Sequence, residues 1–245
     1  MKLVLSDLKL FKDTISIVSE LVNEVTFNLN KDRLELVAID AGNVAMVQLR
    51  ILASNFTECE VEGEEKISIN LANLKQILRR AKNDDTISLS TTESQLEVVL
   101  QGKTRKSFTL PLLDDGEAQT VPPLEFPVNV TLPSTLLSES IDDMSVVSES
   151  MSFMLGADTL SVMAKGDLSD AHVDIPQDED VRISSDGTPR KSKYGLEFLK
   201  KMVGGSKLSD VVIVSLDTNY PLRLDYGVPD KIALSFILAP RVDND

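Results

Sequence analysis

The sequence carries the same apolar pattern twice, and this repeat constrains the fold more than any other feature. A shift of 126 positions places Phe27 on Phe153 without a gap, and an offset of 125 places Leu74 on Leu199 further along. Few identical residues survive between the copies, but the apolar positions coincide. Such a repeat in 245 residues predicts two domains of the same fold in one chain.

The segment between the copies reads DDGEAQTVPPLE, at 114–125, and follows neither a helical nor a strand period. The two adjacent aspartates, the glycine and the pair of prolines are typical of a linker. We therefore predict an N-terminal domain at 1–113, a connector at 114–126 and a C-terminal domain at 127–245.

Each copy contains both helical and strand patterns, which indicates an α+β protein with antiparallel sheets and four amphipathic helices. Helical spacing of apolar residues predicts helices at 7–22, 71–82, 134–148 and 195–204. Alternating residues predict strands at 2–5, 26–30, 34–39, 44–51, 86–90, 96–100, 107–112, 127–132, 151–156, 159–166, 171–175, 211–216, 222–226 and 232–238. We expect the polar stretch 177–193 to end in a loop.

Two of these strands, 107–112 and 171–175, have no assigned partner on one side. An exposed strand edge invites pairing with another chain. The alternative is that neighbouring strands of the same chain cover both edges.

The sequence offers little that catalysis needs. It has no glycine-rich phosphate loop, no HExxH, no paired CxxC and no GxSxG. For the only histidine, His172, we expect a structural role, and the glutamates around Cys59 should raise the pKa of its thiol. We interpret the acidic run 178–180 as a solvated loop. We therefore predict no enzyme activity, no cofactor and no metal site.

The sequence shows no pattern typical of a secreted protein or of a membrane-spanning helix. A single cysteine excludes an internal disulfide and suggests a reducing compartment. No apolar run approaches the roughly 20 residues of a membrane helix, and the N-terminus lacks a signal-peptide pattern.

The formal net charge of −14 argues against a polyanion partner, yet basic residues gather on the predicted helices. No acidic residue lies between Lys66 and Lys82. Because no aromatic residues interleave with them, contact with a duplex backbone fits better than stacking on single strands. The alternative is that these faces are only solvated. The candidate DNA-facing residues are Lys9, Lys12, Lys75, Arg79, Arg80, Lys82, Lys200, Lys201 and Lys207.

The predicted helix at 134–148 is the exception. Its outward positions include Glu139, Asp142 and Asp143, and no lysine or arginine. Facing duplex DNA with this helix would cost energy, unless another basic group neutralises it.

Residues 34–56, LELVAIDAGNVAMVQLRILASNF, closely resemble a signature of the PCNA family of sliding clamps. PLRLDY at 221–226 and ALSFILAPR at 233–241 resemble the last hairpin and the terminal motif of that family, and INLANLKQILRRAKNDD at 69–85 matches as well. The resemblance covers essentially the whole chain. The length and the short acidic tail look more archaeal than eukaryotic.

The resemblance implies a head-to-tail trimeric ring with helices lining the hole and sheets outside. Such a ring encircles duplex DNA, slides, and tethers the replicative polymerase in replication and repair. The implied partners are duplex DNA, further copies of the chain, and a DNA polymerase, clamp loader, flap endonuclease and ligase that bind through short hydrophobic motifs, with no membrane. The implied location is the cytoplasm, at the nucleoid of an archaeon, or the nucleus of a eukaryote.

The resemblance also assigns two protein-binding sites. The subunit interface would join residues 107–112 of one copy to 171–176 of the next, and we hypothesise that the acidic helix pairs with the neighbour's basic helix. The interface residues are Arg80, Lys82, Ser107, Phe108, Leu110, Glu139, Asp142, Asp143, His172, Val173 and Ile175. The partner-motif pocket would contain Ile39, Val44, Met46, Val121, Pro122, Pro221, Ile237, Leu238, Ala239 and Pro240, some of which could instead be ordinary core.

Three alternatives remain open at this point. The chain could be one subunit of a heterotrimeric or checkpoint-type clamp. It could be a metal-dependent nuclease with an acidic site. It could also be a solenoid-like interaction protein unrelated to DNA.

Overall fold

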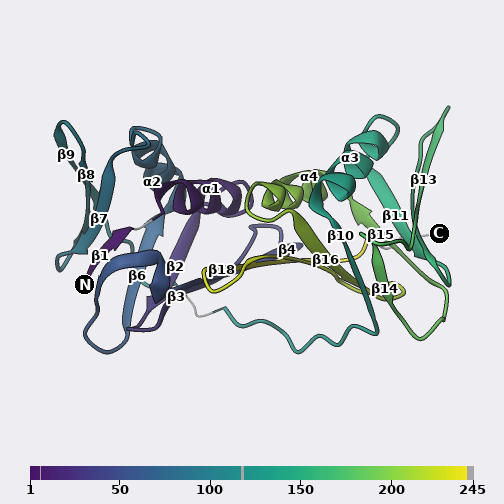
Figure 1. The fold of residues 1–245 in the computed structure, drawn as a ribbon, viewed down its shortest axis with the longest axis horizontal. Coiled ribbons are helices and arrows are strands. Elements are labelled where there is room, and N and C mark those ends of the chain that lie inside the picture. Colours follow the sequence, from purple (N-terminus) through teal and green to yellow (C-terminus); the bar gives the residue numbers. More distant parts are fainter. Residues whose placement is uncertain (6, 117–118, 242–245) are drawn as a thin grey trace. The chain divides into compact units, whose positions relative to one another are not determined.

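The structure, a computed structural model, describes residues 1–5, 7–116 and 119–241. The chain divides into two compact units, whose elements are labelled in Figure 1. Unit 1 comprises Met1–Ala41, Val47–Val121 and Val228–Leu234, and unit 2 comprises Gly42–Met46, Pro122–Gly227 and Ser235–Asp245. Each unit therefore contains a short piece of the other half of the sequence.

Unit 1 places two helices against two antiparallel sheets. Its strands follow the orders β5-β1-β7-β8-β9 and β4-β3-β2-β6. Its elements are β1 (Lys2–Leu5), α1 (Leu8–Val18), β2 (Glu24–Leu29), β3 (Arg33–Ile39), β4 (Ala45–Leu52, of which Val47 onward belongs to this unit), the 3₁₀ turn Ala53–Asn55, β5 (Phe56–Glu60), β6 (Glu65–Asn70), α2 (Leu71–Leu78), β7 (Thr86–Thr91), β8 (Gln95–Gln101) and β9 (Arg105–Pro111).

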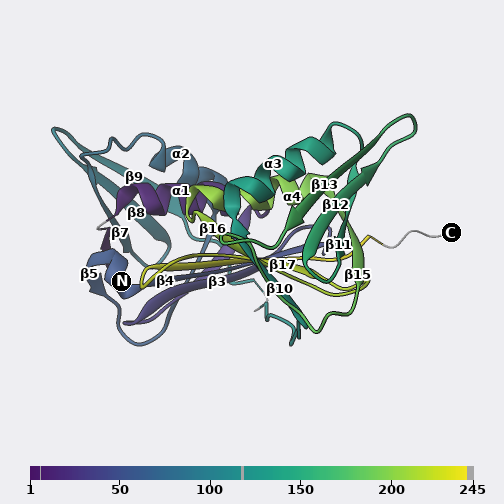
Figure 2. The same ribbon diagram turned by 45° about the vertical axis from the view of Figure 1, so that its right-hand side comes forward.

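Unit 2 repeats this arrangement, and Figure 2 shows α3 and α4 on one side of its strands. Its sheets have the orders β14-β10-β16-β17-β18 and β13-β12-β11-β15. Its elements are β10 (Val128–Pro133), α3 (Ser134–Ser145), β11 (Ser150–Leu155), β12 (Thr159–Lys165), β13 (Asp170–Pro176), β14 (Arg182–Ser184), β15 (Arg190–Gly195), α4 (Leu196–Met202), the 3₁₀ turn Val203–Lys207, β16 (Val211–Leu216), β17 (Leu222–Val228) and β18 (Ile232–Leu238, of which Ser235 onward belongs to this unit).

The duplication predicted from the sequence is confirmed element by element. α1 begins at position 8 and α3 at 134, 126 positions later, while α2 begins at 71 and α4 at 196, 125 positions later. The sheet orders correspond strand for strand. These correspondences confirm the predicted α+β class with two repeated domains.

The apolar stripes predicted for the helices form the cores of the units. Phe11, Ile15 and Val18 of α1 are at most 3 % exposed, and α2 buries Leu71 and Leu74 in the same way. The two helices begin at side-chain caps, because Asp7 accepts from the Leu10 amide at 3.0 Å and Asn70 accepts from the Asn73 amide at 3.1 Å. Burial of one face leaves the opposite face of each helix polar.

Three kinds of prediction need correction. All four helices are shorter than their apolar stripes suggested, and α2 ends at Leu78 where the backbone tightens into turns. The polar stretch 177–193 contains the strand β14 and most of β15. The strands β5 and β6 did not appear among the predicted elements at all.

No helix within the described parts of the chain is both long and apolar enough to cross a membrane.

Candidate nucleic-acid interface and partner surfaces

In unit 1 the basic residues lie at the ends and on the polar faces of α1 and α2. Arg79, Arg80 and Lys82 are exposed and follow the last turn of α2, where positive charge complements the helix dipole. Lys12 is half-buried and its Nζ donates to the carbonyl oxygen of Ala81 at 3.0 Å. The end of α2 therefore concentrates positive charge.

Two other predicted DNA-facing lysines of unit 1 are already paired with carboxylates. Lys9 Nζ lies 2.7 Å from Asp13 Oδ2, and this hydrogen bond raises the pKa of Lys9. Lys75 Nζ lies 2.5 Å from Glu20 Oε1, and its side chain is only 16 % exposed. A phosphate would have to compete with these carboxylates, so Lys9 and Lys75 offer less free charge than the three cations at the end of α2.

In unit 2 the predicted basic residues lie in the last turn of α4 and at the end of the 3₁₀ turn that follows it. Lys200 Nζ donates to Ser145 Oγ at 3.0 Å, which links α4 to the end of α3. Lys201 is half-buried, lies 3.1 Å from Glu197 Oε1 and stands 5.5 Å from the Phe198 ring centroid. Lys207 is exposed at the end of the following 3₁₀ turn. As in unit 1, the exposed positive charge lies near the C-terminal end of the helix, at Lys200 and Lys207.

The polar face of α3 is acidic, as its sequence predicts. Glu139, Asp142 and Asp143 are all exposed, while Leu137 and Ile141 are fully buried on the opposite side. Unit 2 therefore presents a basic helix end at α4 and an acidic face on α3.

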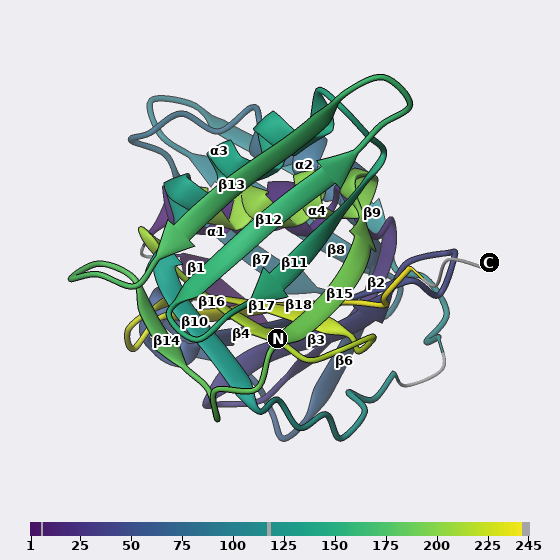
Figure 3. The same cartoon turned by 90° about the vertical axis from the view of Figure 1, so that its right-hand side faces the viewer.

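The two strands that lacked partners are open sheet edges in the described part of the chain. β9 pairs only with β8, and β13 pairs only with β12 at the rim of its sheet (Figure 3). Both strands show the same alternation, with one buried residue, Leu110 in β9 and Ile175 in β13. Ser107 and His172 are exposed, and Phe108 and Val173 are half-buried. The alternative that neighbours within the chain cover both edges is wrong for these residues.

His172 lies at the open edge of β13. Its Nε2 is 2.8 Å from Asp174 Oδ1, and Ser161 Oγ hydrogen-bonds the same carboxylate oxygen. The Ser161 hydroxyl, together with His172, holds the pKa of Asp174 below its usual value. Serine and histidine both bind the aspartate rather than each other, so the three groups do not form a nucleophile–base pair.

Burial, rather than the neighbouring glutamates, raises the pKa of the Cys59 thiol. The predicted direction is correct and the predicted cause is wrong. No cluster of three or more histidine, cysteine or acidic side chains suited to a metal ion occurs within 1–5, 7–116 and 119–241.

The residues predicted for a partner-motif pocket divide between the two units. Ile39 and Val121 belong to unit 1, and both are half-buried. In unit 2, Val44 is 36 % exposed, Pro122 is exposed and Met46, Pro221, Ala239 and Pro240 are half-buried. Ile237 and Leu238 are buried, and Leu238 has no exposed surface, so its side chain belongs to the core.

The structure joins three of the predicted pocket residues in one cavity of unit 2. Val44, Ala239 and Pro240 line a cavity of about 610 Å³ together with Gly195 and Phe198 from the start of α4. The Ala239 amide donates to the Val44 carbonyl oxygen at 2.9 Å and fixes the C-terminal segment beside Val44. The α4 side of this cavity was not predicted, since Gly195 and Phe198 look like ordinary helix-start and core positions in the sequence.

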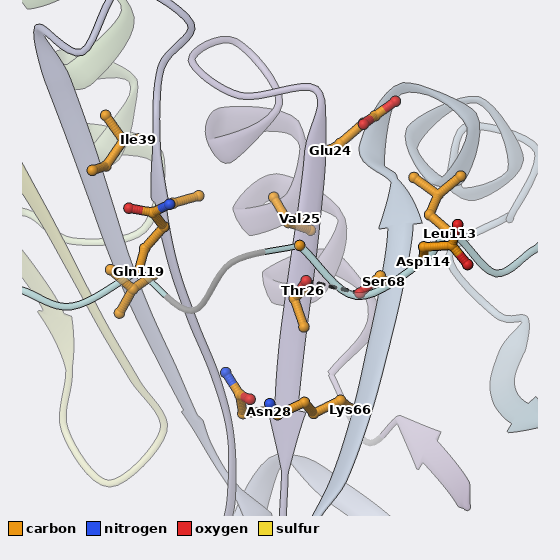
Figure 4. Close-up of a pocket in the computed structure, with 13 residues that line it drawn as sticks. Glu24, Val25, Thr26, Asn28, Ile39, Lys66, Ser68, Leu113, Asp114 and Gln119 are labelled. Carbon is orange, nitrogen blue, oxygen red and sulfur yellow. Dashed lines mark hydrogen bonds between the residues drawn. The ribbon is translucent and has the colours of Figure 1, made fainter.

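A second cavity, of about 290 Å³, lies in unit 1 between the sheet and the connector (Figure 4). Thr26, Asn28 and Lys66 lie on the sheet side, and Leu113 and Gln119 lie on the connector side. Nothing in the sequence indicates this cavity, because its polar residues occupy ordinary solvent-facing positions of strands.

Comparison with known proteins decides the family. Residues 1–111 match the N-terminal domain of proliferating cell nuclear antigen, and residues 120–241 match its C-terminal domain. The chain is 33 % identical to a protein named DNA polymerase sliding clamp from Thermococcus fumicolans, with 99 % of both chains covered. The chain belongs to the PCNA family.

Solved structures of PCNA proteins agree over the whole chain. PCNA from Thermococcus kodakaraensis has a TM-score of 0.90 at 28 % identity, covering 98 % of this chain and 99 % of that chain. A structure of the PCNA2–PCNA3 complex from Sulfolobus tokodaii has a TM-score of 0.89 at 26 % identity, with the same coverage. PCNA-family sliding clamps are processivity factors rather than enzymes.

Proposed function

We propose that this PCNA-family chain forms a ring of three copies that encircles duplex DNA and tethers the replicative polymerase and other DNA-processing enzymes. The observation that carries the proposal is the location of charge. A chain with a net charge of −14 places exposed Arg79, Arg80, Lys82 and Lys207 in the segments that follow α2 and α4. Lysine and arginine neutralise phosphates without reading sequence, which suits a ring that slides.

The open edges of β9 and β13 support the assembly. A head-to-tail contact that uses two different surfaces generates a ring when the rotation closes. In the proposed contact, Ser107, Phe108 and Leu110 of one copy lie beside His172, Val173 and Ile175 of the next. Glu139, Asp142 and Asp143 of α3 would face Arg80 and Lys82 of the neighbouring copy, with about 0–1 kcal/mol from each exposed ion pair.

We further propose that the predicted partner-motif residues receive short hydrophobic motifs of a polymerase, clamp loader, flap endonuclease or ligase. The cavity formed by Val44, Ala239 and Pro240 supports this assignment. We place the domain limits at 113 and 127, with the connector between them, and expect the protein to work at the archaeal nucleoid.

The test combines a measurement of native mass with a measurement of retention on DNA. Native mass spectrometry should give a trimer of the 26.9 kDa chain. After loading by a clamp loader, the protein should stay on closed circular DNA and leave the same DNA once it has been cut. Equal loss from circular and linear DNA would contradict a topological mechanism.

One alternative has specific support. The Sulfolobus tokodaii structure is titled a PCNA2–PCNA3 complex, so related chains occur in complexes of different PCNA proteins. A purified chain that stays monomeric or dimeric at micromolar concentration, and closes a ring only with a second PCNA-family chain, would favour a heterotrimeric clamp.

A further inference from the structure

We propose that Thr26, Ser68 and Asp115 form a latch that fixes where the connector leaves the sheet and thereby positions the connector for partner binding. All three residues belong to unit 1. The inference rests on the proposed function in one respect, since it takes Val121 and Pro122 of the connector as part of the partner site.

The latch is a chain of hydrogen bonds between neighbouring strands and the connector. Ser68 Oγ donates to Asp115 Oδ1 at 2.9 Å, and Thr26 Oγ1 lies 2.8 Å from Ser68 Oγ. A serine hydroxyl has only one proton, and an ionised carboxylate only accepts. Thr26 is therefore the donor to Ser68, and the order of donation runs from Thr26 through Ser68 to Asp115. Successive bonds of this kind polarise and strengthen one another.

The burial of Ser68 indicates what covers the latch. Ile67 and Ile69 of β6 are buried in the core, so strand alternation turns Ser68 to the opposite face of the sheet. Ser68 is nevertheless only 4 % exposed. The Leu113 amide donates to the Ser68 carbonyl oxygen at 2.8 Å, which brings the start of the connector over this serine.

The second copy makes the backbone part of this contact with a different residue. Position 68 corresponds to Lys193, 125 residues later, and the Lys193 carbonyl oxygen accepts from the Arg241 amide at 2.7 Å. Both copies therefore make the same backbone contact after their last strand. In the first copy, whose chain continues into the connector, the side chains of Ser68 and Asp115 join this contact.

A cavity lies beside the latch, between the sheet and the connector. This cavity of about 290 Å³ has Thr26, Asn28 and Ser68 on its sheet side and Asp114 and Gln119 on its connector side (Figure 4). The contacts that hold the connector to the sheet here include the backbone bond of Leu113 and the side-chain bond of Asp115. A fixed starting point limits the positions open to Val121, and a site that is correctly placed for only part of the time binds more weakly in proportion.

The test uses full-length protein and a matched set of variants. Ser68→Ala removes both side-chain bonds, and Asp115→Ala removes one from an exposed position without touching the core. Ser68→Thr keeps the hydroxyl beside a cavity that can accept a methyl group. The control is Ser215→Ala, because Ser215 is 3 % exposed and loses one comparable bond, to Asn129 Oδ1 at 2.7 Å, in unit 2.

Two measurements separate the latch from the partner site. The first is hydrogen exchange at the amides of 113–116, which should accelerate about fivefold in Ser68→Ala and Asp115→Ala, as expected for loss of a typical hydrogen bond. The second is anisotropy of a fluorescein-labelled synthetic peptide with one aliphatic and two aromatic anchors. Its Kd should rise about fivefold in the same two variants and stay unchanged in Ser68→Thr and Ser215→Ala.

Each outcome decides one claim. Unchanged exchange in both alanine variants would overturn the latch. Faster exchange with unchanged peptide affinity would overturn its positioning role. A wild-type protein that does not bind the peptide would contradict the proposed partner site, while the exchange measurement would still decide whether the latch exists.

Discussion

Two buried tyrosines of unit 2 differ in a single hydrogen bond. Tyr194 donates its hydroxyl to the Tyr220 carbonyl oxygen at 2.7 Å, and burial raises the pKa of Tyr194 to about 12. The Tyr226 hydroxyl is buried without a hydrogen-bond partner among the described residues, and burial raises its pKa too. Gly205 lies so close to the Tyr226 ring that a Cβ at position 205 would overlap it. The ring therefore cannot shift toward Gly205 to find a partner.

We predict opposite effects for removing the two hydroxyl groups. Tyr226→Phe should raise the free energy of unfolding by about 1 kcal/mol, because it removes a buried polar group that gains nothing in the fold. Tyr194→Phe should lower it by about 1 kcal/mol, because it leaves the Tyr220 carbonyl without this donor. Urea unfolding with unchanged m-values measures both. A loss of stability in Tyr226→Phe would mean that its hydroxyl is satisfied after all.

At the scale of elements, the open edge of β9 has a defined set of outward groups. The Gly102 amide donates to the Thr104 carbonyl oxygen, and the Leu112 amide donates to that of Ser94, which fixes the hydrogen-bonded pairs of β8 and β9. Since such pairs alternate in an antiparallel ladder, the backbone of Thr109 faces away from β8. Pro111 occupies an equivalent outward position, where a missing amide proton costs no internal bond.

We therefore predict that Thr109→Pro prevents assembly and leaves the subunit folded. The change removes one outward amide donor without breaking the β8–β9 ladder. Light scattering should give a monomer near 26.9 kDa, with circular dichroism like that of the wild type. Thr109→Val keeps the amide and should assemble normally. A Thr109→Pro protein that still forms a trimer would contradict strand pairing at β9.

The sequence predicted the repeated helices and most strands because their inward positions are apolar. β15 was missed because Ser192, a polar residue, occupies one of its buried positions and breaks the apolar alternation. The predicted helix at 71–82 is longer than α2, because the apolar residue Ala81 is buried although it lies beyond the end of the helix. No sequence pattern indicates the cavity under the connector or the latch. In the sequence, Thr26 and Ser68 look like exposed strand residues, and only the folded structure shows that the connector covers them.

At the scale of the whole molecule, the proposed ring combines a negative net charge with local clusters of positive charge. The net charge of −14 repels DNA at long range, and a Debye length of about 8 Å at physiological salt confines that repulsion. Local contacts at Arg79 and Lys207, which the proposed subunit contact does not use, therefore decide much of the affinity for phosphate. A closed ring needs little of this affinity once it is loaded, because topology then holds the DNA.

Positive charge near the helix ends should therefore matter for binding to open DNA and not for retention by a closed ring. The double variant Arg79→Gln and Lys207→Gln should bind open linear duplex more weakly. The slope of log K against log salt is negative, and its magnitude should decrease by about 0.9 for each phosphate that is no longer neutralised. Retention of the loaded ring on closed circular DNA should stay unchanged. The control, Lys31→Gln with Lys191→Gln, removes the same two charges from exposed positions outside the helices and should leave the slope unaltered. An equal change of slope in both variants would mean that the net charge, rather than the helix ends, sets the interaction with DNA.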